Sequence, residues 1–276
     1  MSNIPGLELG VPAVMGILNV TPDSFSDGGR FAARDAALRQ AERMLAEGAQ
    51  IIDVGGESTR PGASDVNVAE ELDRVIPVIE ALADLGDQPI SIDTSKADVM
   101  REAADAGAVL INDVRALREP GAMDAAVVTG CHVCLMHMQG QPRTMQVDPD
   151  YEDVTAEVRD FLIERRDACV RAGVDTSRII LDPGFGFGKQ VAHNVELLAN
   201  LRQLSRLGQP LLVGLSRKST LGALTGREVD DRVAASVTAA VLAVERGAAI
   251  VRVHDVAETV DALKVAGAVM QVEAGI

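Results

Sequence analysis

Polar and charged residues in this sequence stand where short apolar runs end, and they divide into two chemical groups. Carboxylates and an amide form the first group, which suits a flat ligand rich in N–H donors because buried carboxylates need donors. Cations form the second group, which suits a phosphate or a carboxylate. The first group is Asp53, Asp93, Asn112 and Asp182, the second is Arg60, Arg217, Lys218, Arg252 and His254, and Asn19 and His137 occupy similar places.

The segments around these residues alternate between strand and helix patterns. We expect strands over 14–18, 51–54, 89–92, 109–111, 133–136, 179–181, 211–213 and 250–253, and helices over 32–47, 67–85, 95–106, 121–128, 154–173, 194–207, 231–246 and 257–272. Eight units of about 30 residues predict an α/β fold, a TIM-type (β/α)8 barrel that forms a single domain over 1–276. The active site of such a barrel lies at the carboxyl ends of its strands, where the polar residues would meet.

Four residues are expected to shape the helices. Asn67 with Glu70 resembles a capping box, and Ser95 is well placed to cap the helix that follows it. Pro77 is expected to kink or break the helix over 67–85.

Composition excludes several classes of protein. The formal net charge is 26 − 41 = −15, which disfavours binding to nucleic acid or to an anionic membrane. Aromatic residues make up 2% of the chain, too few for base-stacking platforms. The chain has 3 cysteines, an odd number that argues against a disulfide framework and for a cytoplasmic location. The first ten residues do not resemble a secretory signal, and no apolar run reaches membrane-spanning length.

Some weaker patterns have ordinary interpretations. The GFGFGKQ segment at 184–190 matches neither phosphate-binding fingerprint and indicates a tight active-site loop. Cys131 and Cys134 would point to opposite faces of a strand, which disfavours a metal or redox site. His132 and His193 are expected to make packing or capping contacts. No serine or cysteine lies in a G-x-S-x-G elbow, so acyl-enzyme chemistry is poorly supported.

Five motifs are specific enough to suggest a family. They are MGILNVTPDSFSDGG at 15–29, DVGGESTRPG at 53–62, DPGFGFGK at 182–189, SRKS at 216–219 and RVH at 252–254. The chain resembles the dihydropteroate synthase family, the folate-pathway enzymes targeted by sulfonamides, over about 14–272. The resemblance implies condensation of 6-hydroxymethyl-7,8-dihydropterin diphosphate with 4-aminobenzoate, with Mg²⁺ as cofactor and commonly as a homodimer.

The resemblance also implies roles for individual residues. Asp93, Asp182, Lys218 and Arg252 would be catalytic. The pterin would contact Asp53, Asp93, Asn112, Asp182, Phe187 and Lys218, and the aminobenzoate would contact Phe25, Thr59, Pro61, Lys218 and Ser219. The diphosphate would contact Asn19, Arg60, Arg252 and His254, and Asn19 would also meet Mg²⁺.

The glycines and small polar residues at 23–29 predict a lid that orders over the aminobenzoate site when ligand binds. Three alternatives remain open. A methyltetrahydrofolate-binding methyltransferase barrel would share the acidic pterin pocket but would have no diphosphate for the cations to bind. A metal-dependent hydrolase would need several clustered histidines, whereas the chain has 4 in all. A pterin-binding paralogue without catalysis is the third alternative.

Overall fold

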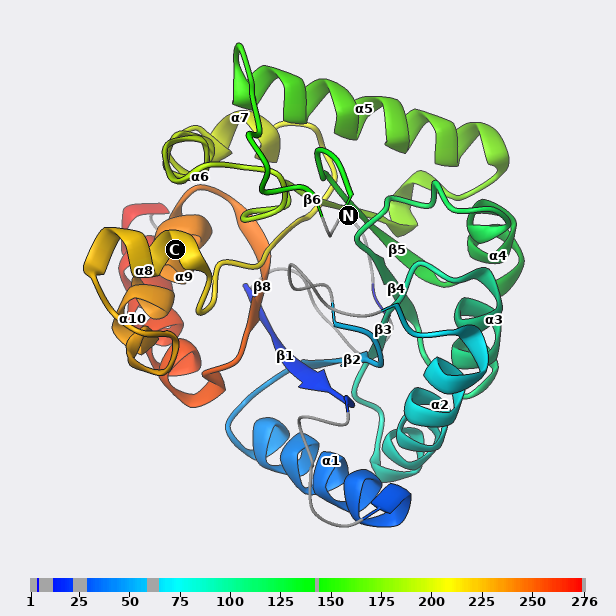
Figure 1. The fold of residues 1–276 in the computed structure, drawn as a ribbon. Coiled ribbons are helices and arrows are strands. Elements are labelled where there is room, and N and C mark those ends of the chain that lie inside the picture. Colours follow the sequence, from blue (N-terminus) through cyan, green and yellow to red (C-terminus); the bar gives the residue numbers. More distant parts are fainter. Residues whose placement is uncertain (1–3, 5–11, 22–28, 59–64, 142–143, 275–276) are drawn as a thin grey trace.

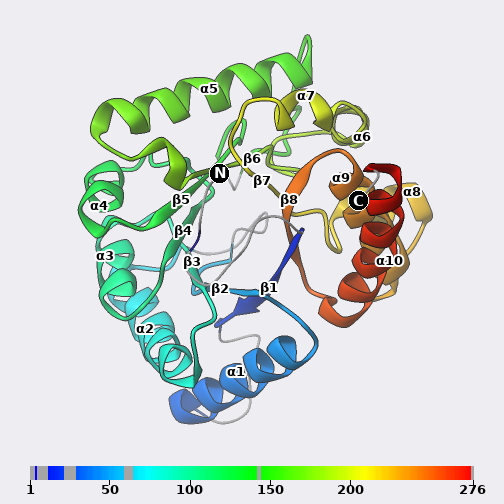
Figure 2. The ribbon, with the colours of Figure 1, turned by 180° about the vertical axis from the view of Figure 1, so that it is seen from behind.

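Eight parallel strands form a closed barrel in the computed structural model, which describes residues 4, 12–21, 29–58, 65–141 and 144–274. The strands follow one another around the barrel in sequence order, and the last strand pairs with the first. Helices surround the barrel on the outside (Figures 1 and 2). This architecture confirms the predicted TIM-type (β/α)8 barrel.

Each strand is short, and its residues are largely buried. The strands are β1 (Ala13–Asn19), β2 (Ile51–Gly55), β3 (Ile90–Asp93), β4 (Leu110–Asp113), β5 (His132–Met136), β6 (Ile179–Asp182), β7 (Leu211–Val213) and β8 (Ala248–Val253). Parallel strands that are covered by helices on one side and close on themselves need apolar residues on both faces. The near-continuous apolar runs of the sequence follow from that requirement.

The helices vary more in length than the strands do. They are α1 (Gly29–Ala46), α2 (Val68–Leu85), α3 (Ala97–Asp105), α4 (Ala122–Thr129), α5 (Val154–Ala172), α6 (Val191–Ala199), α7 (Leu201–Ser205), α8 (Ser219–Thr225), α9 (Val233–Glu245) and α10 (Val256–Ala274). Short 3₁₀ turns, η2 (Thr176–Arg178) and η3 (Val229–Asp231), precede β6 and α9.

A layer of apolar side chains fills the barrel interior. Alternate strand residues point inward, and the inward set packs as one cluster separate from the larger core between barrel and helices. The interior cluster is Ile4, Ala13, Met15, Ile51, Leu110, Cys134, Ile180, Leu212 and Ile250. This layer forms the floor on which any site at the carboxyl ends of the strands must rest.

The structure differs from the sequence-based expectations at several helix ends. Ser95 does not cap α3, because the helix begins one residue later with Lys96 as its N-cap; the Ser95 hydroxyl donates to the Asp113 carboxylate. Asn67 does cap α2, accepting from the backbone N–H of Glu70 at 2.9 Å. The Glu70 carboxylate bonds to Arg74, so the predicted capping box is realised on one side.

The helices also differ from the expected ones in number and continuity. The helix expected over 194–207 is divided at Asn200 into α6 and α7. The α8 helix was not expected, because its seven residues include Gly222 and lie directly behind a strand exit. Pro77 lies inside α2, which extends on both sides of it, so no break occurs there.

Candidate active site at the carboxyl ends of the strands

A polar layer lies directly above the apolar floor of the barrel. Strand alternation places the next inward residue two positions further along each strand. Asp53 therefore follows Ile51, Asn112 follows Leu110, Asp182 follows Ile180 and Arg252 follows Ile250, while Asp93 ends β3. The same two-residue step that fills the floor with apolar side chains brings these five polar residues together from five different strands.

Arg252 is the centre of this layer. Its Nε donates to Oδ2 of Asp53 at 2.6 Å, and its second amino group donates to Oδ2 of Asp93 at 2.8 Å. The Asn112 amide also donates to Oδ2 of Asp53, at 3.1 Å. Burial lowers the pKa of Arg252, but the two carboxylates more than offset that effect and raise it. Arg252 is therefore a permanent cation in an otherwise acidic layer.

Asp53 and Asp93 retain acceptor capacity in this arrangement. Oδ1 of Asp53 is buried and has no hydrogen-bond partner among the described residues. Burial raises the pKa of Asp93 to about 7, with Arg252 opposing the shift and Asp53 adding to it. The layer holds carboxylates whose charge is incompletely compensated, and a ligand with N–H donors would compensate it.

Asp182 and Lys218 face the layer from β6 and from the loop after β7. Oδ1 of Asp182 accepts from the backbone N–H of Gly184 at 2.7 Å. Burial raises the pKa of Asp182, and Lys218 lowers it. Burial also lowers the pKa of Lys218 to about 8, with Asp182 opposing the shift. The lysine is thus poised to titrate close to neutral pH.

The glycine-rich segment 184–188 forms the seat of Lys218. The Lys218 amine donates to the carbonyl oxygen of Phe185 and lies 4.6 Å from the centre of the Phe187 ring, a distance suited to a cation–π contact. A Cβ on Gly186 would lie 3.0 Å from Cδ of Lys218. The prediction of a tight active-site loop over 184–190 agrees with this geometry, in which glycine lets the lysine stem pass.

Asn19, at the end of β1, lies beside Asp93. A Cβ on Gly55 would lie 3.7 Å from Oδ1 of Asn19 and 3.8 Å from Oδ2 of Asp93, so the two side chains share the space that glycine leaves open. No cluster of three or more His, Cys, Asp or Glu suited to a metal occurs within the described ranges. The single carboxamide oxygen of Asn19 is a sufficient protein ligand for Mg²⁺, because this ion commonly keeps waters and substrate phosphate oxygens as its other ligands.

His254 is oriented by Ser216. The backbone N–H of His254 donates to Oγ of Ser216 at 3.1 Å, and its Nδ1 lies 3.1 Å from the same oxygen. The Ser216 hydroxyl therefore contacts both the backbone and the ring of His254, and together these contacts fix the position of the imidazole. His254 is thereby held in one orientation at the exit of β8.

Two residues of the expected constellation point elsewhere. Arg217 has a left-handed backbone with φ of 57°, and its guanidinium binds Asp255, with Nε to Oδ2 at 3.1 Å. It is therefore engaged away from the proposed anion. His137 is buried against Phe161 of α5, with ring centroids 4.9 Å apart, and its Nδ1 lies 2.9 Å from the amine of Lys189.

Several predicted site residues fall outside the part of the chain that the structure describes. These are Phe25, Thr59, Arg60 and Pro61, together with most of the predicted lid over 23–29. Ser219 is described and is exposed at the start of α8. The described site therefore comprises the pterin and diphosphate candidates except Arg60, with Lys218 and Ser219 from the aminobenzoate set.

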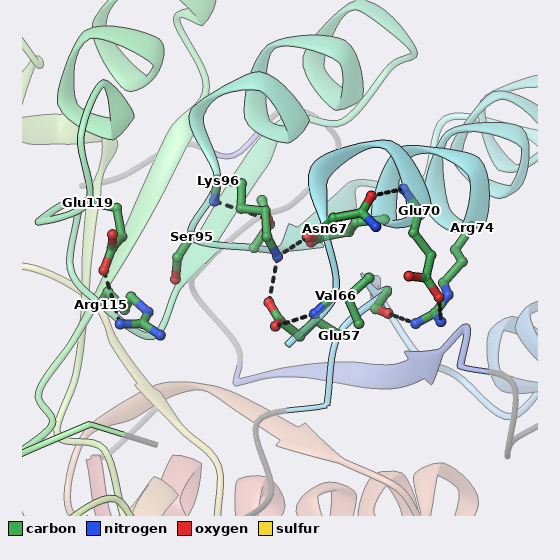
Figure 3. A network of polar contacts seen from close by, with 12 residues as sticks. Glu57, Val66, Asn67, Glu70, Arg74, Ser95, Lys96, Arg115 and Glu119 are labelled. Carbon is green, nitrogen blue, oxygen red and sulfur yellow. Dashed lines mark hydrogen bonds and ion pairs between the residues drawn. The ribbon is translucent and has the colours of Figure 1, made fainter. Parts of the chain in front are cut away.

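A partly buried ionic network joins Glu57, which follows β2, to α2 and to the N-cap of α3 (Figure 3). The Lys96 amine binds the Glu57 carboxylate at 2.6 Å and also the fully buried Glu71. The other oxygen of Glu57 accepts from the backbone N–H of Val66 at 3.1 Å. Sequence patterns had not singled out this network, because Glu57, Glu71 and Lys96 come from three separate segments and nothing in their spacing marks them.

The cysteines and the minor histidines are structural. Cys134 packs inside the barrel and Cys131 in the outer core, on the opposite sides predicted from strand alternation. All three cysteines are free thiols and buried. His193 accepts from the backbone N–H of Gln190 at 3.2 Å and so caps α6, as predicted. No described helix has the length and hydropathy needed to cross a membrane.

Comparison with known proteins identifies close relatives. The family described as "Pterin binding enzyme" matches residues 15–254. The chain is 56% identical to the dihydropteroate synthase of Haemophilus influenzae over 94% of each chain. It is 54% identical to that of Escherichia coli K12, over 96% of this chain and 94% of the relative.

Solved structures give the same result. The Yersinia pestis dihydropteroate synthase with a sulfonamide drug complex superposes with a TM-score of 0.92 at 55% identity, covering 96% of each chain. The Xanthomonas albilineans enzyme in complex with 7,8-dihydropteroate superposes with a TM-score of 0.88 at 54% identity, covering 96% of this chain and 95% of that one.

Proposed function

The chain belongs to the dihydropteroate synthase family of pterin binding enzymes, and on that basis we propose how its residues carry out the family's reaction. It is a transferase that joins 6-hydroxymethyl-7,8-dihydropterin diphosphate to 4-aminobenzoate, giving 7,8-dihydropteroate and diphosphate. The main support for the proposed site is the polar layer, in which Arg252 is hydrogen-bonded to both Asp53 and Asp93. A methyltransferase barrel is disfavoured by identities of 54% and 56% to synthases over nearly the whole chain.

The pterin ring is proposed to bind over Asp93, Asn112 and Asp182. A pterin offers a ring N–H and an exocyclic amino group, and these donors match the acceptors of the layer. Lys218 would donate to the ring oxygen, and the Phe187 ring beside it would cover the bicycle. Asp53 would act beneath the ring through Arg252 and Asn112, with which it is hydrogen-bonded.

The diphosphate is proposed to bind at the exits of β1 and β8. Arg252, His254 and Arg60 would supply charge and donors, and Asn19 would hold Mg²⁺. When bound, Mg²⁺ would neutralise part of the diphosphate charge and so favour its departure as a leaving group. The 4-aminobenzoate would lie against Lys218 and Ser219, with Phe25, Thr59 and Pro61 completing its pocket.

The reaction is proposed to be SN1-like. The bond between the pterin methylene and the diphosphate oxygen breaks first, and the diphosphate leaves with the electron pair. The resulting cationic pterin is stabilised by the carboxylates of Asp93 and Asp182, since fixed charges act strongly in a desolvated site. The amino nitrogen of 4-aminobenzoate then forms the new bond to the methylene and loses a proton. No protein nucleophile takes part.

Replacing Asp93 tests this assignment. Asp93→Asn retains the size of the side chain but removes the charge that stabilises the pterin cation, so kcat/KM should fall by about 10²–10³. Asp84→Asn, on the exposed face of α2, is the matched control and should leave turnover unchanged. Wild-type turnover in Asp93→Asn would show that the charge of this residue does not contribute to the reaction.

A homodimer is proposed on the basis of one helix face. Val265, Val269 and Val272 of α10 share a face by their spacing, and their exposed fractions are 69%, 55% and 78%. The helices α8, α9 and α10 lie side by side on the same side of the barrel (Figures 1 and 2). Replacing Val265 and Val269 by Asp should convert the dimer to a monomer in sedimentation velocity, whereas wild-type monomers would contradict the proposal.

A cytoplasmic location is also proposed. Its support is that the cysteines at 131, 134 and 169 are buried free thiols, as expected in a reducing compartment. Fractionation of cells that produce the full chain should recover it with the cytoplasmic markers, and recovery with membranes or medium would contradict this location.

A further inference from the structure

Lys189 is a buried lysine that the reaction described above does not use. It directly follows the glycine-rich segment 184–188, and only 3% of its surface is exposed. Its amine lies 2.8 Å from the carbonyl oxygen of Gly184, 3.2 Å from that of Phe187 and 2.9 Å from Nδ1 of His137. A charged amine buried without such partners would strongly destabilise the fold. The three contacts therefore compensate for the burial of the Lys189 amine.

The three contacts can be satisfied in either protonation state of the amine. As an ammonium group, Lys189 donates to both carbonyls and to Nδ1 of His137. As a neutral amine, it donates to the two carbonyls and accepts from a protonated Nδ1. Burial lowers the pKa of Lys189 well below that of an exposed lysine. The cluster therefore holds its geometry whether or not the amine is charged.

The two carbonyls that Lys189 binds lie at either end of one tight turn. The backbone N–H of Phe187 donates to the carbonyl of Gly184 at 3.1 Å, and Lys189 closes the turn from the other side. Gly184 has φ of 68°, and a Cβ there would lie 1.8 Å from the carbonyl oxygen of His137. The turn is thus packed directly on the segment after β5, and Lys189 ties the two segments together.

This turn presents three groups to the active site. Its Phe185 carbonyl accepts from the Lys218 amine, and the Phe187 ring faces the same amine. Its Gly184 N–H binds Oδ1 of Asp182. A change in the turn would therefore reach both Lys218 and Asp182.

We propose that Lys189 is a positioning residue for the pterin half of the active site, because with His137 it fixes the 184–188 turn that seats Lys218 and orients Asp182. Lys189 does not itself touch the proposed ligand. The identity of the ligand rests on the proposed function, whereas the link between Lys189 and Lys218 stands on geometry alone.

The link can be measured without substrate. The chain has four lysines, Lys96, Lys189, Lys218 and Lys264, so a chain labelled with ¹³C at lysine Cε gives four NMR signals that single substitutions can assign. Lys189→Met removes the amine that donates to the carbonyls of Gly184 and Phe187, while keeping a side chain of similar length. His137→Phe keeps a ring against Phe161 and leaves the Lys189 amine in place, so it separates loss of the contact with His137 from loss of the amine itself.

In both variants the Lys218 signal should move, and its titration midpoint should rise by about one pH unit toward that of an exposed lysine. The Lys264 signal should not change. Leu82→Ala, a cavity in α2 on another side of the barrel, is the stability control and should lower Tm without moving the Lys218 signal. An unmoved Lys218 signal in His137→Phe, or an equal movement in Leu82→Ala, would overturn the inference even if Lys189→Met does not fold.

Binding supplies a second readout. The Kd of 6-hydroxymethyl-7,8-dihydropterin diphosphate, measured by calorimetry without 4-aminobenzoate, should rise about tenfold in Lys189→Met and His137→Phe, equivalent to about 1.4 kcal/mol. It should stay within about twofold in Leu82→Ala. A wild-type chain that binds no pterin would contradict the proposed function, while the Lys218 signals would still decide the role of Lys189. A Kd unchanged in both variants would overturn that role.

Discussion

Arg252 donates from Nε to Oδ2 of Asp53 across 2.6 Å, although 199 positions separate the two residues in the chain. The contact joins the last strand of the barrel to the second. Asp53 is fully buried, and its other carboxylate oxygen has no hydrogen-bond partner among the described residues. Arg252 therefore supports the acidic layer as well as being a candidate diphosphate ligand, and its replacement should affect folding and catalysis together.

Arg252→Met should lower the free energy of unfolding by about 3–5 kcal/mol, because it leaves Asp53 and Asp93 buried without their cation. Arg252→Lys should cost less stability, since it keeps one charge but loses the paired geometry. Urea unfolding measures both. Equal stability of wild type and Arg252→Met would contradict the supporting role.

The pH dependence of kcat/KM should be bell-shaped. Asp93 has a pKa of about 7 and stabilises a cation only when ionised, so activity should rise as pH increases through that value. Lys218 has a pKa of about 8 and donates as a cation only when protonated, so activity should fall above that value. The optimum should lie between the two limbs.

Lys218→Arg tests the assignment of the alkaline limb. Arginine stays protonated throughout the accessible range, so the fall in kcat/KM above the optimum should disappear even if the maximal rate is lower. The rise on the acid side should remain. An alkaline limb that persists in Lys218→Arg would assign it to another group.

Asn19→Ala should weaken the response to Mg²⁺ more than it weakens pterin binding. The carboxamide is the proposed protein ligand of an ion that otherwise relies on waters and phosphate oxygens. In a Mg²⁺ titration of chelator-treated enzyme, the concentration for half-maximal rate should rise about tenfold. An unchanged Mg²⁺ dependence would exclude Asn19 as a ligand.

Ser216→Ala should reduce kcat/KM by about two- to tenfold, because it removes the hydroxyl that contacts both the backbone N–H and Nδ1 of His254. The fall in kcat/KM should appear mainly in the value measured for the pterin diphosphate substrate. Thr238→Ala is the control, because this exposed hydroxyl of α9 contacts only the carbonyl of Ala234 among the described residues. If both variants lose the same activity, Ser216 does not orient His254 for catalysis.

The barrel could be predicted because its signals are local and repeated. A buried strand needs an apolar run, and two-residue alternation explains why Asp53, Asn112, Asp182 and Arg252 meet above Ile51, Leu110, Ile180 and Ile250. The polar residues were predicted to meet because the active site of such a barrel lies at the carboxyl ends of its strands.

The partners of individual side chains could not be predicted in this way. Arg217 and Lys218 are adjacent in sequence, yet the left-handed backbone of Arg217 turns its guanidinium to Asp255 while Lys218 enters the site. Ser95 donates to Asp113 and does not cap α3, because the end of β4, 18 positions away, supplies a carboxylate acceptor for its hydroxyl. The contact between His137 and Lys189 likewise forms only in the folded chain, because 52 positions separate the two residues.

The most direct test of the whole account is the stoichiometry of products formed by the purified chain from 6-hydroxymethyl-7,8-dihydropterin diphosphate and Mg²⁺, with and without 4-aminobenzoate. Dihydropteroate and diphosphate should appear in equal amounts and only when 4-aminobenzoate is present. Diphosphate released without dihydropteroate would indicate a hydrolase, and the absence of both products would indicate a pterin-binding protein without catalysis; either result would contradict the account.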